Sequence, residues 1–391
     1  MTQRFEVMMR RRRRGRCGGA CLLAAASAGC LAVAPSARGA MLVTHSGKIC
    51  IGPASFGAAG IAVGGHASQA ADIACFQNSR RMPLFMPHGI LLTNGSALRG
   101  RGRMTSAAFH FHSDAFGKMT IPASQLQAIV YAPTPATRFG RLAARPPCVI
   151  LKNHATLRGA VAWMDRRAIG FRCASGLVRI AKSRLQCLVL RRPALRPPGQ
   201  SRRFIRLKNG DLWTARTVTD AAAGLVANGR QIPWDAVAAL WTVGPHCVPL
   251  TSLTRLKSSV SRRGRKRRHG LPASPMYINY LRRGFLADRG PRHGQYFETG
   301  IGCRPGATAP YKIGAGYKTF VAALAVNGRA SIAIQVDGDG KTLLRRKIRP
   351  GAAQWIHVQV SGIKTLGLKT LVGRDKLLTP QVIWGDAYLL K

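Results

Sequence analysis

Short apolar runs separated by turn-forming residues recur from residue 41 to about residue 250. In one copy an apolar run at 89–92 is followed by Asn94-Gly95, by Arg99-Gly100, and finally by Ile121-Pro122 and an apolar run at 126–130. An Asn-Gly turn between apolar runs is typical of a β-hairpin, because glycine supplies the positive φ angles that a tight turn needs. The pattern therefore predicts small β modules.

The spacing of these features repeats along the chain. Arg99, Pro122 and Leu126 lie 5, 28 and 32 residues after Asn94, and three residues stand at the same offsets after Asn153, namely Arg158, Ala181 and Leu185. Copies begin near residues 41, 89, 148 and 203; the last is shorter by about four residues and the first is degenerate. Repeats of this size indicate tandem or stacked supersecondary units, either one barrel or separate modules.

The segment 275–391 has a different pattern, with about eight short alternating strands separated by turn signals. Alternation of this kind predicts an antiparallel jelly-roll β-sandwich. The predicted fold class is therefore all-β, with tandem hairpin- or barrel-like repeats at 40–253 followed by a C-terminal sandwich. A basic, disordered linker is expected between them at 254–274.

Residues 1–39 have the pattern of an export signal. Arginines at 10–14 and 16 precede an apolar stretch, and Ala37-Arg38-Gly39 offers small residues for cleavage before Ala40. A membrane anchor and lipidation of Cys30 are the alternatives for this segment. Export would place the protein in the periplasm, on the cell surface or outside the cell.

The charge is strongly positive. The 391 residues include 61 Lys and Arg but 13 Asp and Glu, a formal net charge of +48, and most of it lies beyond residue 39. Such a charge favours anionic partners through the release of counterions. The run at 262–268 resembles a nucleic-acid or heparin patch, or else is a solvated tether; export makes nucleic acid a poor partner and favours anionic polysaccharide.

Few residues are available for catalysis or for metal binding. The glutamates are Glu6 and Glu298, and the sequence lacks the Gly-x-Ser-x-Gly and His-Glu-x-x-His motifs as well as any Cys-x-x-Cys pair. The protein is predicted not to be an enzyme. Cys75 and Cys187 align with Ala128 and Ala239 of other copies, so we expect small buried thiols there. Arg99 and Arg158 mark either solvated strand ends or ligand-facing positions.

The C-terminal segment resembles the NPCBM family of carbohydrate-binding modules over about 100 residues. The resemblance rests on the phrase at 297–302 (Phe-Glu-Thr-Gly-Ile-Gly), the strand at 317–322, the hairpin at 337–341 and the ending at 384–387 (Trp-Gly-Asp-Ala). It implies a galactose-binding-like jelly roll in a bacterial, usually exported protein. Cys303 and Arg304 depart from the family's usual residues after Gly-Ile-Gly.

Four residues are candidates for carbohydrate binding, because sugar sites combine an aromatic face with planar polar groups. They are Arg304, Tyr311, Trp355 and Asp386. Trp384 is expected in the core, and Asp337 and Asp339 are expected as turn formers. No cofactor or metal site is predicted from the residues, although the family resemblance would admit calcium.

These observations favour an exported, non-catalytic carbohydrate-binding protein with a preference for anionic polysaccharide. The alternative is a structural protein of the cell envelope that uses its β repeats for protein–protein contacts. No membrane-spanning segment is expected after residue 39.

Overall fold

The computed structural model describes residues 40–57, 60–78, 85–86, 88–105, 108–135, 145–191, 201–221, 224–253, 256, 276–278, 284–287, 294–297, 300–303, 305–327, 330–351, 353–371 and 381–391. Regular elements in these residues are strands and short 3₁₀ turns, which confirms the predicted all-β class. Within the same residues no helix is long and apolar enough to cross a membrane. The predicted signal segment at 1–39 and the basic run at 262–268 lie outside the described residues.

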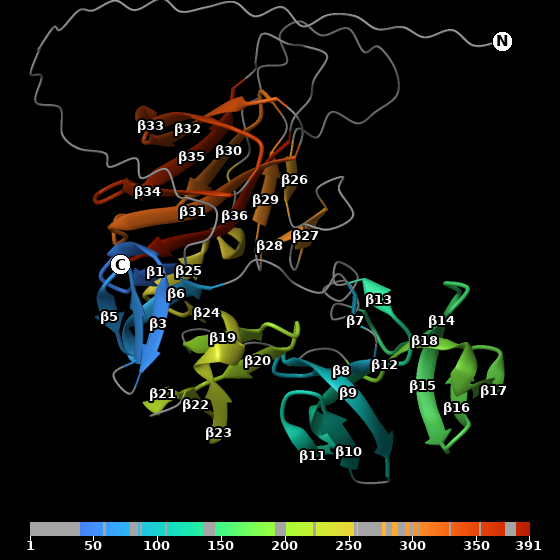
Figure 1. Cartoon of the computed structure of the whole chain (residues 1–391). Coiled ribbons are helices and arrows are strands. Elements are labelled where there is room, and N and C mark those ends of the chain that lie inside the picture. Colours follow the sequence, from blue (N-terminus) through green and yellow to red (C-terminus); the bar gives the residue numbers. More distant parts are fainter. Residues whose placement is uncertain are drawn as a thin grey trace, which may run out of the picture. The chain divides into compact units, whose positions relative to one another are not determined.

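Four segments, which we call repeats 1 to 4, share one plan that ends with a 3₁₀ turn and a last strand (Figure 1); the long second strand of repeats 2 and 3 is divided into two strands in repeats 1 and 4. Repeat 1 contains β1 (Ala40–Thr44), β2 (Ile49–Gly52), β3 (Ala54–Gly57), β4 (Gly60–Val63), β5 (His66–Ser68), η1 (Ala70–Asp72) and β6 (Ile73–Gln77). Repeat 2 contains β8 (Gly89–Leu92), β9 (Ala97–Met104), β10 (Ala108–Ser113), β11 (Gly117–Pro122), η2 (Ala123–Gln125) and β12 (Leu126–Val130).

Repeats 3 and 4 follow the same order. Repeat 3 contains β14 (Cys148–Leu151), β15 (Thr156–Met164), β16 (Ala168–Cys173), β17 (Gly176–Ala181), η3 (Lys182–Arg184) and β18 (Leu185–Val189). Repeat 4 contains β19 (Arg202–Leu207), β20 (Leu212–Ala215), β21 (Val218–Ala221), β22 (Gly224–Ala227), β23 (Arg230–Pro233), η4 (Trp234–Ala236) and β24 (Val237–Val243). Between the repeats, β7 (Phe85–Met86) pairs with β13 (Thr134–Pro135).

The second strand of repeats 2 and 3 bends sharply at the Arg-Gly pair. The first part of β9 pairs with β8 as far as Arg99, and from Gly100 onward the strand pairs with β10. Gly100 has φ +143° and the equivalent Gly159 has φ +153°, and a Cβ at either would overlap a backbone carbonyl oxygen of the neighbouring strand. Glycine is therefore required where the strand crosses from one sheet to the next.

The last strands join the repeats in pairs. β12 pairs with its own first strand β8 and, on its other edge, with β18 of repeat 3; β24 pairs with β6 of repeat 1 in the same way. Cys75 and Cys187 lie in these last strands and are buried, as the sequence predicts.

Repeats 2 and 4 meet through their second strands, where Leu212 pairs with Ala97. Asp211, which is completely buried, accepts a hydrogen bond of 2.7 Å from the backbone N–H of Arg99. The hydroxyl of Ser96 accepts one of 2.9 Å from the backbone N–H of Thr214. Burial raises the pKa of Asp211 to about 6, although the hydrogen bonds from Arg99 and Asn209 oppose this change.

The C-terminal segment forms two antiparallel sheets (Figure 1). One contains β26 (Met276–Ile278), β29 (Gly300–Cys303), β36 (Gln381–Leu390), β31 (Thr319–Asn327) and β34 (Gln354–Gln359), with β25 (Cys247–Pro249) pairing to β36. The other contains β30 (Thr308–Lys312), β35 (Thr365–Thr370), β32 (Ile332–Gly338) and β33 (Lys341–Ile348). A separate hairpin pairs β27 (Gly284–Ala287) with β28 (Gly294–Phe297).

Apolar side chains from both sheets form one core. Trp384 is completely buried there, as the sequence predicts, together with Phe320, Ile334 and Leu368. Asp339 and Gly340 have positive φ angles of 47° and 85°, so they form the hairpin turn between β32 and β33. Asp337 instead lies within β32, where it accepts side-chain hydrogen bonds.

We predict that Gly159→Ala destabilises the protein by about 2–4 kcal/mol, because alanine tolerates neither this φ angle nor the contact with the carbonyl of Arg172. Thermal and urea unfolding would measure the loss. Gly316→Ala is the matched control, since a Cβ there would have no neighbour within 4 Å and its φ is not positive. Equal stability of the two variants would contradict the explanation of the bend.

We predict that Asp211 makes the fold more stable in mild acid. Its pKa is higher in the folded chain, so its contribution is complete below the unfolded value of 3.8 and is lost as the pH rises through about 6. The loss amounts to roughly 3 kcal/mol at neutral pH. Unfolding at pH 4 and pH 7.5 should show a smaller pH dependence for Asp211→Asn than for the parent chain.

The control for this experiment is Asp235→Asn, which changes an exposed aspartate of η4. This variant should keep the pH dependence of the parent chain. A pH dependence that persists unchanged in Asp211→Asn would contradict the assignment to Asp211.

Candidate functional site

Basic side chains gather on the outer face of the four-stranded sheet of the sandwich. Gln335 pairs with Arg345 on one side and with Lys369 on the other, so these three residues form one row across the sheet. Lys347 lies two residues from Arg345 on β33, and side chains two residues apart on a strand share a face. Lys312 ends β30 at the opposite edge of the sheet, where it pairs with Thr365, four residues before Lys369 on β35. We call Lys312, Arg345, Lys347 and Lys369 the cationic face.

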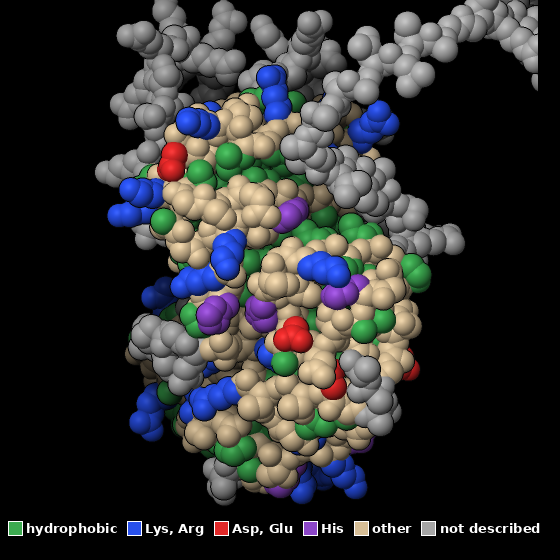
Figure 2. All heavy atoms as spheres, turned by 90° about the vertical axis from the view of Figure 1, so that its left-hand side faces the viewer, with side chains coloured by type: hydrophobic (Ala, Val, Ile, Leu, Met, Phe, Trp, Pro, Cys, Tyr) green, Lys and Arg blue, Asp and Glu red, His purple; other side chains and the backbone are tan. Residues whose placement is uncertain are grey.

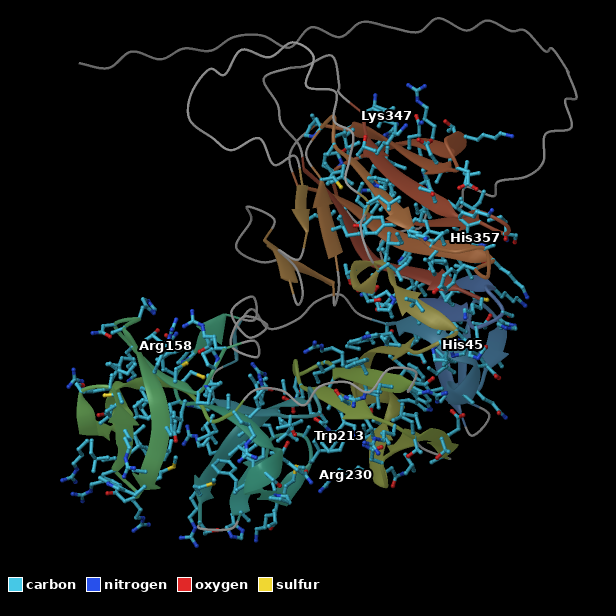
Figure 3. The ribbon with its side chains drawn as sticks, turned by 180° about the vertical axis from the view of Figure 1, so that it is seen from behind. His45, Arg158, Trp213, Arg230, Lys347 and His357 are labelled. Atoms are coloured by element: carbon cyan, nitrogen blue, oxygen red, sulfur yellow. The ribbon has the colours of Figure 1, made fainter. Side chains whose placement is uncertain are left out.

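One carboxylate lies within this face. Asp337 forms an ion pair with Lys369 and accepts a hydrogen bond of 2.7 Å from Nε2 of Gln335, which also donates to the hydroxyl of Thr342. Hydrogen bonds from Lys369 and Gln335 hold the pKa of Asp337 below its usual value, although partial burial opposes them. Lys347 and Arg345 remain exposed, and Lys347 is marked on the sandwich in Figure 3.

The structure does not bring together the three predicted site residues that it describes. Tyr311 is 1% exposed and packs in the core, so its ring presents no face to a ligand. Trp355 is half-buried on β34 and Asp386 is largely buried on β36, both in the six-stranded sheet. Arg304 lies outside the described residues.

Trp355 and Asp386 are nevertheless near one another in the sheet. Ala323 pairs with Trp355 on one side and with Gly385 on the other. Asp386 has φ +45° and lies at the bulge opposite the step from Val321 to Ala323. A bulge of this kind redirects a side chain at the point where regular pairing is interrupted.

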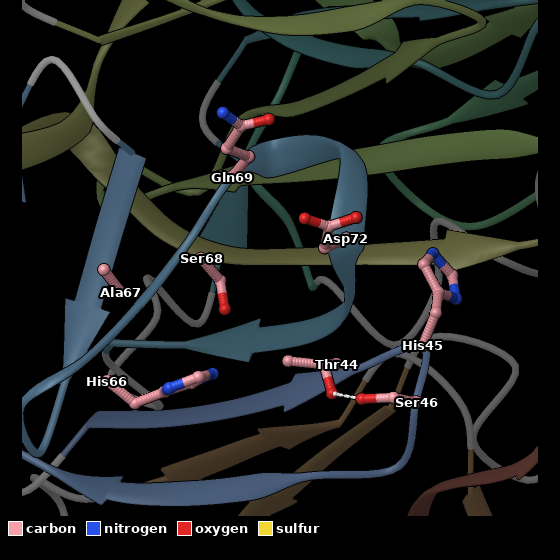
Figure 4. A pocket seen from close by; sticks show the side chains of 8 residues that line it. All are labelled: Thr44, His45, Ser46, His66, Ala67, Ser68, Gln69 and Asp72. Atoms are coloured by element: carbon pink, nitrogen blue, oxygen red, sulfur yellow. Dashed lines mark hydrogen bonds between the residues drawn. The ribbon is translucent and has the colours of Figure 1, made fainter.

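A polar pocket of about 480 Å³ lies in repeat 1, far from these candidates in the sequence (Figure 4). The end of β1 and the turn after it form one side, and β5, Gln69 and the last residue of η1 form the other. Its lining residues are Thr44, His45, Ser46, His66, Ala67, Ser68, Gln69 and Asp72. No sequence pattern indicated this pocket, because its residues come from two separate segments of the degenerate first copy of the repeat.

Neither the pocket nor the cationic face supplies a metal centre. Among the described residues, no three His, Cys, Asp or Glu side chains lie close enough together to hold a metal ion. The described residues therefore offer no cluster of three carboxylates to the calcium that the family resemblance would admit.

The fold and its C-terminal core define an all-β protein that ends in an antiparallel β-sandwich. Comparison with known families identifies this sandwich more closely, because residues 291–390 match the NPCBM/NEW2 domain family. This confirms the resemblance that the sequence suggests. No curated protein matches the chain.

Several solved structures are similar to parts of the chain at low sequence identity. A CBM51 from Clostridium perfringens GH95, in complex with methyl-galactose, is 21% identical, with 25% of this chain and 74% of that chain covered and a TM-score of 0.23. The tandem CBM51 modules of Sp3GH98, a family 98 glycoside hydrolase from Streptococcus pneumoniae SP3-BS71, are 13% identical over 66% and 91% of the two chains, with a TM-score of 0.28.

A third similar structure is the M60 catalytic domain with the CBM51-1 and CBM51-2 domains from Clostridium perfringens ZmpB. It is 21% identical over 25% of this chain, with a TM-score of 0.24. The present chain spans about a tenth of its length, since 11% of that chain is covered.

Proposed function

We propose that the protein is an exported, non-catalytic carbohydrate-binding protein that favours anionic polysaccharide. The NPCBM/NEW2 match at residues 291–390 carries the carbohydrate-binding part of this proposal. The cationic face, on the outer surface of the same sandwich, supports the preference for anionic chains.

The geometry of the cationic face suits a linear, charged polymer. Within the described residues Lys369 is paired with a carboxylate, that of Asp337. The other three cations of the face have no carboxylate partner there. Gln335 lies between Arg345 and Lys369 and adds a planar polar group of the type that recognises hydroxyls. Figure 2 shows Lys and Arg side chains spread over one side of the molecule with few acidic side chains between them.

Charge alone would attract any polyanion, so the test must separate the cationic face from the rest of the basic surface. The triple variant Lys312→Gln, Arg345→Gln, Lys347→Gln removes three charges from the face. We predict that it weakens retention of the full chain on heparin and on polygalacturonate at least about tenfold at low salt, since each cation near an anionic surface contributes about 1 kcal/mol. The affinity of the variant should also depend less steeply on the salt concentration than that of the parent chain.

The matched control is Arg101→Gln, Arg103→Gln, Lys118→Gln, which removes three exposed charges from repeat 2. The proposal expects a clearly smaller effect from this control. Equal losses would assign the attraction to bulk charge, and retention unchanged in both variants would reject the cationic face as a binding surface.

Export gives a separate prediction. The residues at 1–39 match a cleaved signal, so the mature chain should begin at Ala40. Mass spectrometry of the N-terminal peptide from the natural source would check this, together with fractionation of the cells. A mature chain that keeps its arginine-rich start and stays in the cytoplasm would contradict export.

A further inference from the structure

The pocket in repeat 1 occupies a position that every repeat shares. In all four repeats the turn after the first strand donates a backbone hydrogen bond to a carbonyl of the 3₁₀ turn: His45 to Asp72, Thr93 to Gln125, Lys152 to Arg184 and Lys208 to Ala236, at 2.8 to 2.9 Å. Repeat 2 places threonine and glutamine at these two positions, repeat 3 places lysine and arginine, and repeat 4 places lysine and alanine. Repeat 1 instead places histidine and aspartate there, which changes the chemistry of an otherwise common site.

The carboxylate of Asp72 is available to a ligand. Several other described aspartates accept hydrogen bonds that hold the fold; Asp220, for example, accepts one from the backbone N–H of Ala70, and Asp339 accepts two from the backbone of β35 and the residue before it. Asp72 is exposed, and within the described residues its carboxylate accepts no hydrogen bond. Figure 4 shows this carboxylate, the Ser68 hydroxyl and the His66 ring on different sides of one space.

The hydrogen bonds around His66 define what its ring can offer. The ammonium of Lys48 lies 3.0 Å from Nδ1 of His66. An ammonium group can only donate, so Nδ1 is the acceptor and the proton of the neutral ring is on Nε2. The ring therefore offers an N–H donor at Nε2, while Asp72 offers an acceptor.

Hydroxyl and amide groups complete the lining. The hydroxyls of Thr44 and Ser46 are 2.7 Å apart, and the Thr44 hydroxyl also accepts a hydrogen bond from the backbone of Lys48. Gln69 lies at the rim. Groups that donate and groups that accept thus surround one space, which is what a ligand with several hydroxyls requires, because each hydroxyl does both.

The pocket wall is fixed before any ligand arrives. Arg203 of repeat 4 donates a hydrogen bond of 3.0 Å to the carbonyl of Ala71, and Asp220 of the same repeat accepts one of 2.8 Å from Ala70. These contacts anchor η1 from outside repeat 1. A preformed wall lowers the entropy lost on binding.

The charges nearby favour a neutral ligand. Asp72 disfavours an anion inside the pocket, whereas Lys48 beside His66 and Arg203 behind η1 disfavour a cation. A volume of about 480 Å³ lies within the range of small-molecule sites. We propose that this pocket is a second binding site, separate from the NPCBM/NEW2 domain, for a neutral polyhydroxylated ligand the size of one or two sugar units.

The test uses the full chain with labelled histidine rings and a panel of neutral probes: galactose, glucose, mannose, N-acetylglucosamine and their β-linked disaccharides. We expect at least one probe to shift the ring resonances of His66, with an affinity that does not change in high salt. Asp72→Asn and Gln69→Ala should each weaken this binding at least about tenfold, the loss expected when a hydrogen bond to a charged or planar polar group is removed.

Asp235→Asn is the matched control, because it changes an exposed aspartate in the 3₁₀ turn of repeat 4. It should leave the probe affinity unchanged, and thermal unfolding would show that all three variants are folded. Absence of binding by every probe up to its solubility limit would overturn the proposal, as would binding that neither Asp72→Asn nor Gln69→Ala weakens.

The result is independent of the function proposed for the sandwich. The charge-removal variant of the cationic face should leave the His66 shifts intact, and Asp72→Asn should leave retention on heparin intact. Loss of binding at one site can therefore be measured while binding at the other site is unchanged.

Discussion

The last strand of each repeat is paired on both edges, and the arrangement of the repeats depends on this pairing. A small β module that stood alone would expose the outer edge of that strand, which is a template for aggregation. Here β12 pairs with β18, and β6 pairs with β24. The shared edge also explains the residues chosen at these positions: Cys187 lies opposite Val130 across one junction and Cys75 lies opposite Trp241 across the other, and these thiols are buried. Small apolar side chains are needed there because apolar neighbours pack against both edges.

The scarcity of acidic residues makes the position of each described carboxylate informative. The protein has only 13 Asp and Glu against 61 Lys and Arg, and several of the described aspartates link separate parts of the fold. Asp211 joins repeats 2 and 4, Asp220 joins repeats 1 and 4, and Asp337 neutralises Lys369 on the sandwich. Each of these aspartates contacts a neighbouring strand or repeat. Asp72 differs because it faces a pocket, and this difference is why the pocket is a candidate site and not simply a gap between elements.

The sequence predicted the β class, the repeat order and the C-terminal sandwich, because glycine turns and alternation are local signals. The Arg-Gly pairs were recognised as part of the repeat, but the role of Gly100 and Gly159 in bending the second strand depends on contacts with β10 and β16. Tyr311, a predicted site residue, shows that local sequence patterns have the same limit when they are used to predict a binding site. Its alternation in β30 is clear, yet which face of the strand meets the core depends on the second sheet. The pocket was missed since Thr44 and Asp72 are separated by a whole hairpin in the copy with the weakest repeat signal.

The two proposed sites respond to different physical forces, and this difference shapes how the protein would hold a glycan. Attraction to the cationic face acts at a distance but weakens with salt, because counterions screen exposed charges. Hydrogen bonding in the pocket of repeat 1 acts at contact distance and changes little with salt. A polymer that carries both acidic and neutral sugar units, and is long enough to span the two sites, would form its second contact at a high effective concentration. Retention at physiological salt then depends less on net charge than on the spacing of neutral units along the polymer.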